Sequence, residues 1–269
     1  MTDNPVATDA VAEAADRLLR AQAGGTPCPP VRDLIGRDDV TAAYAVQQFL
    51  TRARLAAGEH VVGRKIGLTS PAVQAQLGVD QPDFGVLFDT MRYEDGAAVP
   101  AAAVLQPRAE AEIAFVLGAD LADGELSVDQ VRAAVDHAVA AIEICGSRIA
   151  GWDISFADTV ADNASGGAFV LGPDRLDLAD FEPRDAVMTL EVDGEQVSAG
   201  TGTACLGDPL RAVRWLARQA RALGDPLRAG QVILSGALGP MVPVAPGSTV
   251  RATVAPLGTA SFTLAEEQR

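Results

Sequence analysis

The stretch Val61-Val62-Gly63-Arg64-Lys65-Ile66-Gly67-Leu68 marks the point at which the pattern of the chain changes. Before it, apolar residues recur at helical spacing in two amphipathic segments, 6–23 and 41–57. After it, short runs rich in Val, Ile and Leu alternate with Gly, Pro and Asp breaks, which is typical of strands. The sequence therefore predicts a helical cap or interface region at 1–60 and a β-rich domain at 61–269, joined in one continuous structural unit.

Nine runs from residue 61 onward have the length and composition of strands. They lie at 61–68, 84–88, 111–117, 140–145, 168–171, 186–192, 231–235, 249–254 and 261–264. Two further helices are expected at 127–138, with Ser127 as N-cap, and at 209–223. The strand spacing is too irregular for a Rossmann fold or a barrel. We therefore expect an α+β protein with a mixed, mostly antiparallel β core and helices on its outside.

The composition bounds the class of partner. The chain has 269 residues, of which 48% are hydrophobic, so it can bury a sizeable core. Its net charge of -15 argues against nucleic acid and anionic membranes, because phosphate binding needs concentrated Lys and Arg. A small anionic substrate stays compatible with this charge, since a divalent cation can invert the local field.

Cysteine usage and the N-terminus bear on the compartment. Cys28, Cys145 and Cys205 are odd in number and far apart, which suits a reducing cytoplasm and gives no zinc signature. Residues 1–15 are polar and acidic, unlike a signal peptide, and no apolar stretch reaches the roughly 18 residues of a membrane span. We therefore expect a soluble cytoplasmic protein.

Lys65 is the only lysine among 21 basic residues, and all the others are arginines. Arginine stays protonated under ordinary conditions, whereas a partly buried lysine can be shifted to titrate near neutral pH and move a proton. Lys65 therefore has two interpretations: a catalytic acid or base, or a charge that survived by chance on a surface strand.

Three glutamates give the strongest chemical signal. Glu110 and Glu112 lie two apart at the entrance to a predicted strand, so their side chains point to the same face. Neighbouring like charges repel unless something neutralises them, and a divalent cation is the obvious neutraliser. Glu143 is the only charge in the apolar run 138–145, so we expect it to be buried. An all-oxygen set suits Mg²⁺ or Mn²⁺, while the alternative for Glu110 and Glu112 is the solvated face of an edge strand.

Three further segments combine glycine with polar residues. Asp83 lies in a predicted turn, 80–85, where it is either a helper acid/base or a turn cap. The segment 151–167 is predicted as a long polar loop, by default on the surface. The glycines of 235–241 would let a ligand approach backbone amides closely.

Together, six segments resemble the 2-keto-4-pentenoate hydratase family (2-hydroxypentadienoate hydratases of aromatic meta-cleavage pathways), which belongs to the fumarylacetoacetate hydrolase superfamily. They lie at 63–69, 78–85, 105–113, 146–149, 158–165 and 236–241. They follow the family's order across nearly the whole chain, and jointly they are very specific. Cys145 stands where apolar residues are usual in the family, a departure that leaves the implied function intact.

The resemblance implies a fold, a reaction and a set of site residues. The fold is a mixed β-sandwich roll with an N-terminal helical cap. The reaction is the metal-dependent addition of water to 2-hydroxypenta-2,4-dienoate, a small 2-hydroxydienoic or 2-keto acid, in aromatic or steroid catabolism. The implied site residues are Lys65 and Asp83 for catalysis, Glu110, Glu112 and Glu143 for Mg²⁺ or Mn²⁺, and Ser165, Leu238, Gly239 and Gln106 for the substrate.

The resemblance also bears on the oligomeric state of the protein and on the pKa of Lys65. It implies a homo-oligomer, a pentamer or decamer, and it is compatible with a complex with a downstream aldolase or a related decarboxylase. A lysine beside a bound cation has its ammonium form disfavoured, so a lowered pKa is expected for Lys65.

Two alternatives stay open: a 4-oxalocrotonate decarboxylase of the same fold, and a catalytically idle partner in a hydratase–decarboxylase complex. Gly146 and the segment 238–241 favour the hydratase, and an idle partner would not need Lys65. A C–C hydrolase of the superfamily usually activates water with a His–Glu pair. His60 and His137 are interpreted as surface or helix residues outside the metal motifs.

Overall fold

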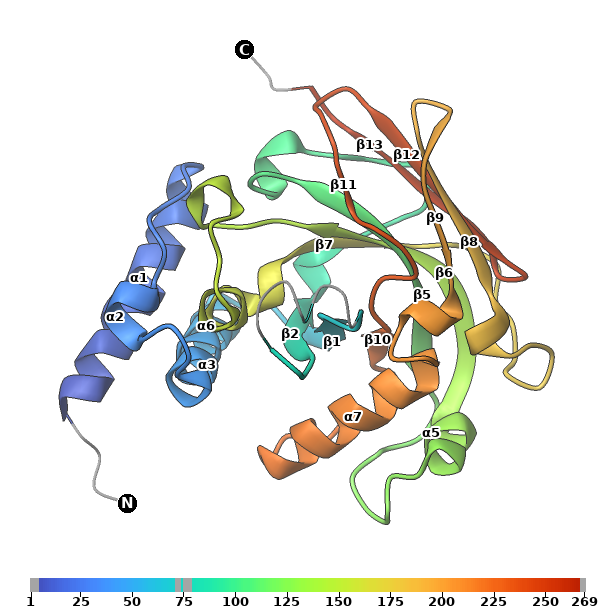
Figure 1. Cartoon of the computed structure of the whole chain (residues 1–269), viewed down its shortest axis with the longest axis horizontal. Coiled ribbons are helices and arrows are strands. Elements are labelled where there is room, and N and C mark those ends of the chain that lie inside the picture. Colours follow the sequence, from blue (N-terminus) through green and yellow to red (C-terminus); the bar gives the residue numbers. More distant parts are fainter. Residues whose placement is uncertain (1–4, 71–73, 75–78, 267–269) are drawn as a thin grey trace.

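The computed structural model of the chain describes residues 5–70, 74 and 79–266, and it contains two β-sheets (Figure 1). The larger sheet runs, in spatial order, through β2 (Asp83–Phe88), β1 (Val61–Gly67), β10 (Val232–Leu234), β5 (Arg108–Leu117), β6 (Val135–Cys145), β7 (Gly166–Leu171) and β3 (Arg92–Tyr93), with β11 (Val242–Pro243) also paired to β5. The smaller sheet runs through β4 (Ala97–Val99), β13 (Gly258–Leu264), β12 (Thr249–Ala255), β8 (Val187–Val192) and β9 (Glu195–Thr201). The predicted α+β class with mixed, mostly antiparallel sheets is confirmed.

The helices form two groups (Figure 1). On the left of the view lie α1 (Pro5–Gly24), α2 (Arg32–Ile35), α3 (Val40–Ala56) and α6 (Phe156–Ala161). On the side of the sheets lie α5 (Val128–Ala134) and α7 (Pro209–Ala222), which contact each other. The predicted cap is present, since Ser127 accepts a hydrogen bond from the Gln130 N–H, and Asp39 caps α3 in the same way by accepting one from the Ala42 N–H.

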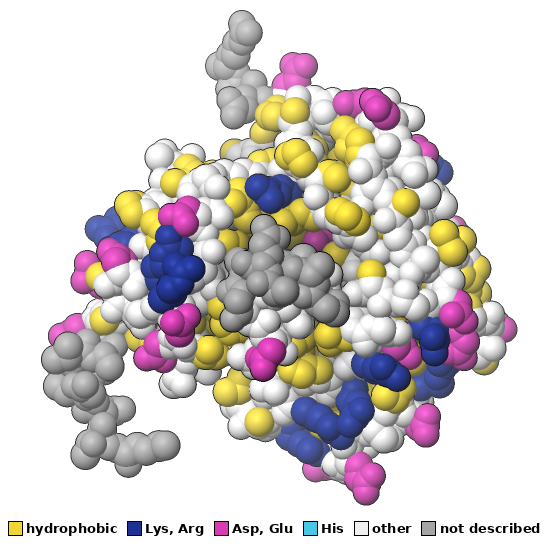
Figure 2. Space-filling view, viewed as in Figure 1, with side chains coloured by type: hydrophobic (Ala, Val, Ile, Leu, Met, Phe, Trp, Pro, Cys, Tyr) yellow, Lys and Arg dark blue, Asp and Glu magenta, His cyan; other side chains and the backbone are white. Residues whose placement is uncertain are grey.

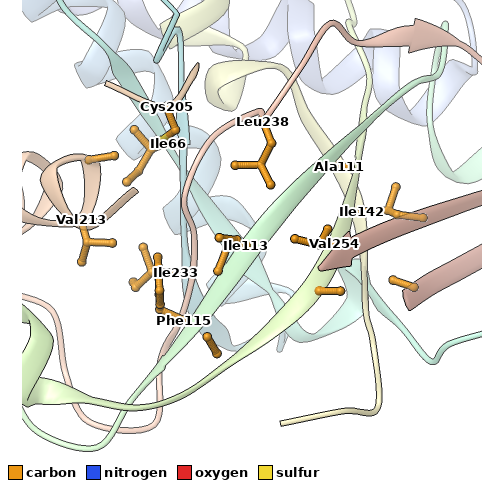
Figure 3. Packing of buried hydrophobic residues seen from close by; sticks show 14 of the residues in the cluster. Ile66, Ala111, Ile113, Phe115, Ile142, Cys205, Val213, Ile233, Leu238 and Val254 are labelled. Atoms are coloured by element: carbon orange, nitrogen blue, oxygen red, sulfur yellow. The ribbon is translucent and has the colours of Figure 1, made fainter. Parts of the chain in front are cut away.

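Alternation along β5 separates the main hydrophobic core from the charged residues. The side chains of Ala111 and Ile113 belong to the large buried cluster, together with Val254 of β12 and Val213 of α7 (Figure 3). Because successive side chains of a strand point to opposite faces, the glutamates of β5 lie on the other face of the sheet. The apolar core thus supports the charged site from behind.

A second, smaller hydrophobic core contains residues of both the N-terminal helices and α6. Phe156 and Val160 of α6 pack with Leu18 of α1 and Val46 of α3. The region 1–60 is therefore tied to a segment from the middle of the chain. The division into two regions at residue 60 stays a prediction. The structure does not describe residues 1–4, 71–73, 75–78 and 267–269. Gly78, which belongs to one of the family-like segments, lies among them.

Some predicted elements were wrong. The helix expected at 127–138 ends at Ala134, and residues 135–138 begin β6, so His137 lies on a strand. The segment 151–167 is largely buried, because a capping box at Ser155 starts helix α6 and the helix packs its small apolar residues inward. The strands β3, β4, β9 and β11 had no prediction, since most are very short.

Acidic and basic side chains intermingle on the visible surface (Figure 2). On this face the basic ones gather mainly over α7, whose sequence carries four arginines. Among the described helices, none combines the length and apolar character that crossing a bilayer requires.

Candidate active site

The register between β5 and β6 brings the three predicted glutamates together. Glu110 of β5 lies directly opposite Glu143 of β6, and Glu112 lies two residues further along the same face. Both strands are in the interior of the sheet, so the edge-strand alternative for Glu110 and Glu112 is wrong. Glu112 and Glu143 are almost fully buried, and Glu110 is half-buried.

These carboxylates are short of hydrogen bonds. Oε2 of Glu112 accepts one from the Gly236 N–H at 2.7 Å, but its Oε1 has no partner within the described part of the chain. Glu143 has no hydrogen bond to a described residue either, and the only partner of its oxygens within the described part of the chain is the Lys65 ammonium, which forms an ion pair with Oε1. Burying a carboxylate without such partners costs several kcal/mol by the usual order of magnitude. The arrangement is therefore incomplete by itself and suits a bound cation.

Lys65 reaches this cluster from β1. Its Nζ lies 3.1 Å from Oε1 of Glu143 and donates a hydrogen bond to the Ala164 carbonyl at 2.8 Å. The side chain is only 3% exposed, so the surface-strand interpretation of Lys65 is wrong. One cation among several buried carboxylates leaves the cluster with an excess of negative charge.

Asp83 also lies close to Lys65. It is buried on β2 opposite Gly67 of β1, where a Cβ would lie 2.2 Å from Asp83 Oδ1 and 3.4 Å from Lys65 Nζ. Glycine at 67 thus leaves space for the carboxylate beside the ammonium. Thr159 donates a hydrogen bond to Oδ2 at 3.4 Å, whereas Oδ1 has no partner among the described residues. Asp83 is therefore a buried strand residue rather than a turn cap.

The Ala164 carbonyl is presented by an unusual turn. Asn163, Ala164 and Ser165 all have positive φ, at 55°, 50° and 55°. Such backbone conformations are costly for residues other than glycine and persist only where surrounding contacts hold them. The Asn163 side chain supplies these contacts, since it accepts from the Val86 N–H and donates to the Val86 carbonyl. Sequence reasoning missed the roles of Asn163, Ala164 and Thr159, because they depend on pairing with distant strands.

The residues predicted to bind the substrate lie in different surroundings: one is next to Asp83, one packs in the core and one contacts a loop. The Ser165 hydroxyl lies 3.1 Å from that of Thr159, next to Asp83. The Leu238 N–H donates to the Ala111 carbonyl, and its side chain lies in the core (Figure 3). Gln106 uses its amide on the backbone of the 147–151 loop. Substrate binding by these residues and by Gly239 stays a prediction.

Burial and charge shift the titration of the site. Burial, together with the charge of Glu110, raises the pKa of Glu143 to about 7, although Lys65 lowers it. Burial and the charges of Glu143 and Glu110 raise the pKa of Glu112 well above its usual range. Burial by itself would lower the pKa of the Lys65 ammonium, but Glu143 and the other surrounding negative groups hold it well above its ordinary value. The lowering expected beside a bound cation concerns the metal-loaded site and stays a prediction.

The histidines lie away from this cluster. His60 is exposed and pairs with Asp89, and His137 pairs with its neighbour Asp136. The donor set near Lys65 therefore consists of carboxylate oxygens and the thiol of Cys145, which lies near Glu110 and Glu143. Hard oxygen donors with unused lone pairs fit a divalent cation such as Mg²⁺, Ca²⁺ or Mn²⁺.

Comparison with known proteins matches this geometry. Residues 60–265 match the family described as fumarylacetoacetate (FAA) hydrolase, C-terminal. The TodF product hydratase of Pseudomonas putida is 53% identical over 95% of this chain and 96% of its own length. The 2-keto-4-pentenoate hydratase of Burkholderia vietnamiensis is 52% identical over 96% of this chain and 98% of its own.

Among solved structures, the 4-oxalocrotonate decarboxylase from Pseudomonas putida G7, complexed with magnesium and adipate, superimposes with a TM-score of 0.91. It is 32% identical, and the match covers 96% of this chain and 97% of that one. The chain thus has the fumarylacetoacetate hydrolase-like architecture that the resemblance implied. It belongs to the fumarylacetoacetate hydrolase family and, within it, to the 2-keto-4-pentenoate hydratases.

Proposed function

We propose that the protein is a metal-dependent hydro-lyase that adds water to 2-hydroxypenta-2,4-dienoate and forms 4-hydroxy-2-oxopentanoate. The observation that carries the proposal is the convergence of Glu110, Glu112 and Glu143 on Lys65 in a buried cluster with unused carboxylate oxygens. The relatives that share about half of its residues over nearly its full length are named as hydratases, which supports the same reaction here. A role in aromatic or steroid catabolism follows from this substrate.

The cation is Mg²⁺ or Mn²⁺, held by Glu110, Glu112 and Glu143. Three ionised carboxylates carry more negative charge than Lys65 balances, which favours a divalent ion over a monovalent one. Magnesium in the related decarboxylase structure supports this choice. When bound, the cation supplies Lewis acidity that stabilises negative charge on the 2-oxygen and carboxylate of the substrate.

Two protein groups move the protons. The reaction takes the dienol to its 2-keto form with a proton added at C5, and water then adds at C4 while C3 gains a proton. Lys65 Nζ holds a proton between Glu143 and the Ala164 carbonyl, in position to deliver it. Asp83 Oδ1, which has no other partner in the described chain, accepts a proton from the hydroxyl or from the attacking water. The net change is the gain of one water.

The protein also positions the substrate and excludes bulk water. Ser165 donates its hydroxyl to the substrate carboxylate, and the backbone at Leu238 and Gly239 shapes the pocket. The side chains of Lys65, Asp83 and Glu143 are nearly inaccessible, so proton transfer takes place in a medium of low polarity where electrostatic effects are large. The Gln106 amide holds the loop after β6, and its contact with the substrate stays a prediction.

A decarboxylase of 4-oxalocrotonate is the second candidate, because a solved decarboxylase shares the fold and almost the full length. Sequence identity separates the two readings, at 53% to the hydratase and 32% to the decarboxylase. A catalytically idle partner is the third, and the intact set of Lys65, Glu110, Glu112 and Glu143 speaks against it.

The proposed setting is the reducing cytoplasm, in agreement with three free cysteines. We expect a homo-oligomer, a pentamer or decamer, which light scattering on the purified protein measures. A downstream aldolase, which would consume the 4-hydroxy-2-keto acid, and a related decarboxylase are the expected partners in a complex.

The decisive assay uses freshly generated 2-hydroxypenta-2,4-dienoate with and without Mg²⁺ or Mn²⁺. Loss of the dienol absorbance that requires the metal, with a product heavier by one water, supports the hydratase. If the dienol persists while 4-oxalocrotonate loses CO₂, the decarboxylase is correct. If neither substrate is consumed by the metal-loaded protein, the idle partner is the remaining reading.

A further inference from the structure

Cys145 belongs to the charged face, although the mechanism proposed above does not use it. It follows Glu143 by two residues on β6, so both side chains point to the same face of the sheet. Its thiol donates a hydrogen bond to Oε1 of Glu110, with 3.5 Å between sulfur and oxygen. One ligand atom from each of Glu110, Glu143 and Cys145 lies within 4.8 Å of the others.

The buried carboxylate beside the thiol points independently to a ligand. Glu143 is 1% exposed; its Oε1 forms an ion pair with Lys65, and its Oε2 has no partner among the described residues. Glu112 differs, because one of its oxygens is already held by the Gly236 N–H. The cluster therefore offers a sulfur and two sets of carboxylate oxygens to one small volume.

We propose that Glu110, Glu143 and Cys145 bind a thiophilic divalent cation, Zn²⁺ or Cd²⁺, in a mode separate from the all-oxygen site. Borderline and soft cations prefer thiolate, whereas Mg²⁺ does not. Neighbouring ligand atoms around tetrahedral zinc lie about 3.5 Å apart, given the usual zinc–sulfur and zinc–oxygen bond lengths. The sulfur and the Glu110 oxygen already have this spacing. On binding, the cation replaces the thiol proton, which leaves to the solvent.

This mode shares two glutamates with the site of the proposed hydratase. A cation held by Cys145 therefore excludes Mg²⁺ or Mn²⁺, and Zn²⁺ or Cd²⁺ competes with them. The expected loss of turnover when Zn²⁺ or Cd²⁺ replaces Mg²⁺ or Mn²⁺ rests on the proposed function. Binding itself does not depend on which reaction the protein catalyses.

The test is a titration of metal-free protein with Cd²⁺, followed by the ultraviolet charge-transfer absorbance of the cadmium–thiolate bond. The band is expected in the unaltered protein and absent in Cys145→Ser. Cys28→Ser and Cys205→Ser are matched controls that keep the band, since Cys28 is half-buried elsewhere and the Cys205 thiol donates to the Ser235 carbonyl. Because loss of even an outer partner of a ligand costs about 10–100-fold in metal affinity, the ratio of Cd²⁺ to Mg²⁺ affinity in Cys145→Ser should fall at least about tenfold.

Three results would overturn the inference: no band at saturating Cd²⁺, a band that survives in Cys145→Ser, or a band lost in Cys28→Ser. If Cys145→Ser does not fold, a second experiment is used in its place: the unaltered protein is saturated with Mn²⁺ and then titrated with Cd²⁺. Suppression of the cadmium band then supports the shared glutamates, and persistence contradicts them. If the protein shows the cadmium band but does not hydrate the dienol, the cation-binding inference holds and the proposed function is wrong. If it hydrates the dienol but shows no band, the proposed function holds and the cation-binding inference is wrong.

Discussion

Two clusters of buried charge, one around Asp162 and one around Lys65, differ in how completely their hydrogen bonds are satisfied. In the first, Asp162 accepts hydrogen bonds from the Arg148 side chain and backbone and from Ser147. The two terminal nitrogens of Arg148 each donate a hydrogen bond, one to the Gly166 carbonyl and one to the Asp162 carbonyl. In the second, around Lys65, several carboxylate oxygens have no hydrogen bond to the described residues.

The difference separates structural charge from functional charge. A buried ion pair whose lone pairs are all used holds the chain in place and offers nothing to a ligand. A buried cluster with unused lone pairs is costly in the free protein, and it gains most when a cation arrives. Mutations in the two clusters should therefore have opposite signatures, one in stability and the other in activity.

The largest effect is expected for Lys65→Arg. This change keeps a positive charge but removes a group able to deliver a proton, so kcat should fall by about 10²–10⁴. Steady-state kinetics on the dienol measures it. Arg64→Lys is the matched control, because Arg64 is a buried neighbour that pairs with Asp225 outside the cluster. Turnover of Lys65→Arg at near the original rate would remove Lys65 from the mechanism.

The next effect is on stability, in the satisfied cluster. Arg148→Leu leaves the Asp162 carboxylate buried without its partner and should cost about 3–5 kcal/mol of unfolding free energy. Glu112→Gln in the metal-free protein should cost nothing or stabilise it, since the amide replaces a carboxyl whose charged form is disfavoured by burial and by Glu143. Urea unfolding compares the two variants. Equal losses would mean that the clusters do not differ in kind.

Metal binding should reverse the cost of the unsatisfied cluster. With Mg²⁺ or Mn²⁺ at about 100 times its Kd, the unfolding free energy should rise by about 2.7 kcal/mol. Glu143→Gln should lose this gain. Glu59→Gln should keep it, because Glu59 pairs with Arg54 elsewhere. Thermal unfolding with and without the cation measures the effect, and an equal gain in both variants would place the cation outside the cluster.

The pH dependence of the metal-free protein should carry the signature of Glu143. Burial raises its pKa from 4.5 to about 7, so the folded state binds more protons than the unfolded state between these values. Stability from this group is therefore highest at low pH and is lost as the pH rises from about 4.5 to 7. Unfolding across this range should show a weaker decline in Glu143→Gln. An identical slope in both proteins would contradict the raised pKa.

The smallest effect is expected for Ser165→Ala. Loss of one hydrogen bond of about 1 kcal/mol to the substrate should lower kcat/KM about fivefold, mainly through KM. The same kinetic assay detects it. If KM and kcat are both unchanged, Ser165 serves only Thr159 and does not touch the substrate.

Local patterns predicted much of this site. The two-residue spacing of Glu110 and Glu112 was sufficient to predict that their side chains share one face, and the apolar setting of Glu143 was sufficient to predict its burial. The uniqueness of Lys65 pointed to a special position. The family resemblance then joined these residues into one site.

The rest depends on long-range pairing that spacing does not reveal. The left-handed turn at Ala164 exists because Asn163 binds the backbone of β2, 77 residues away. The burial of α6 follows from its contact with the N-terminal helices. Local sequence does not reveal this contact, so the small residues of α6 were predicted as a surface loop. Cys145 did carry a local signal, two residues after Glu143, but without the register its nearness to Glu110 was hidden.

The function proposed here depends on the carboxylate oxygens near Lys65 holding the catalytic cation. An anomalous difference map from a crystal grown with Mn²⁺ tests it directly. We expect one strong peak per chain, about 2.0–2.6 Å from oxygens of Glu110, Glu112 and Glu143. A strong peak elsewhere, or an empty cluster at saturating Mn²⁺, would contradict it.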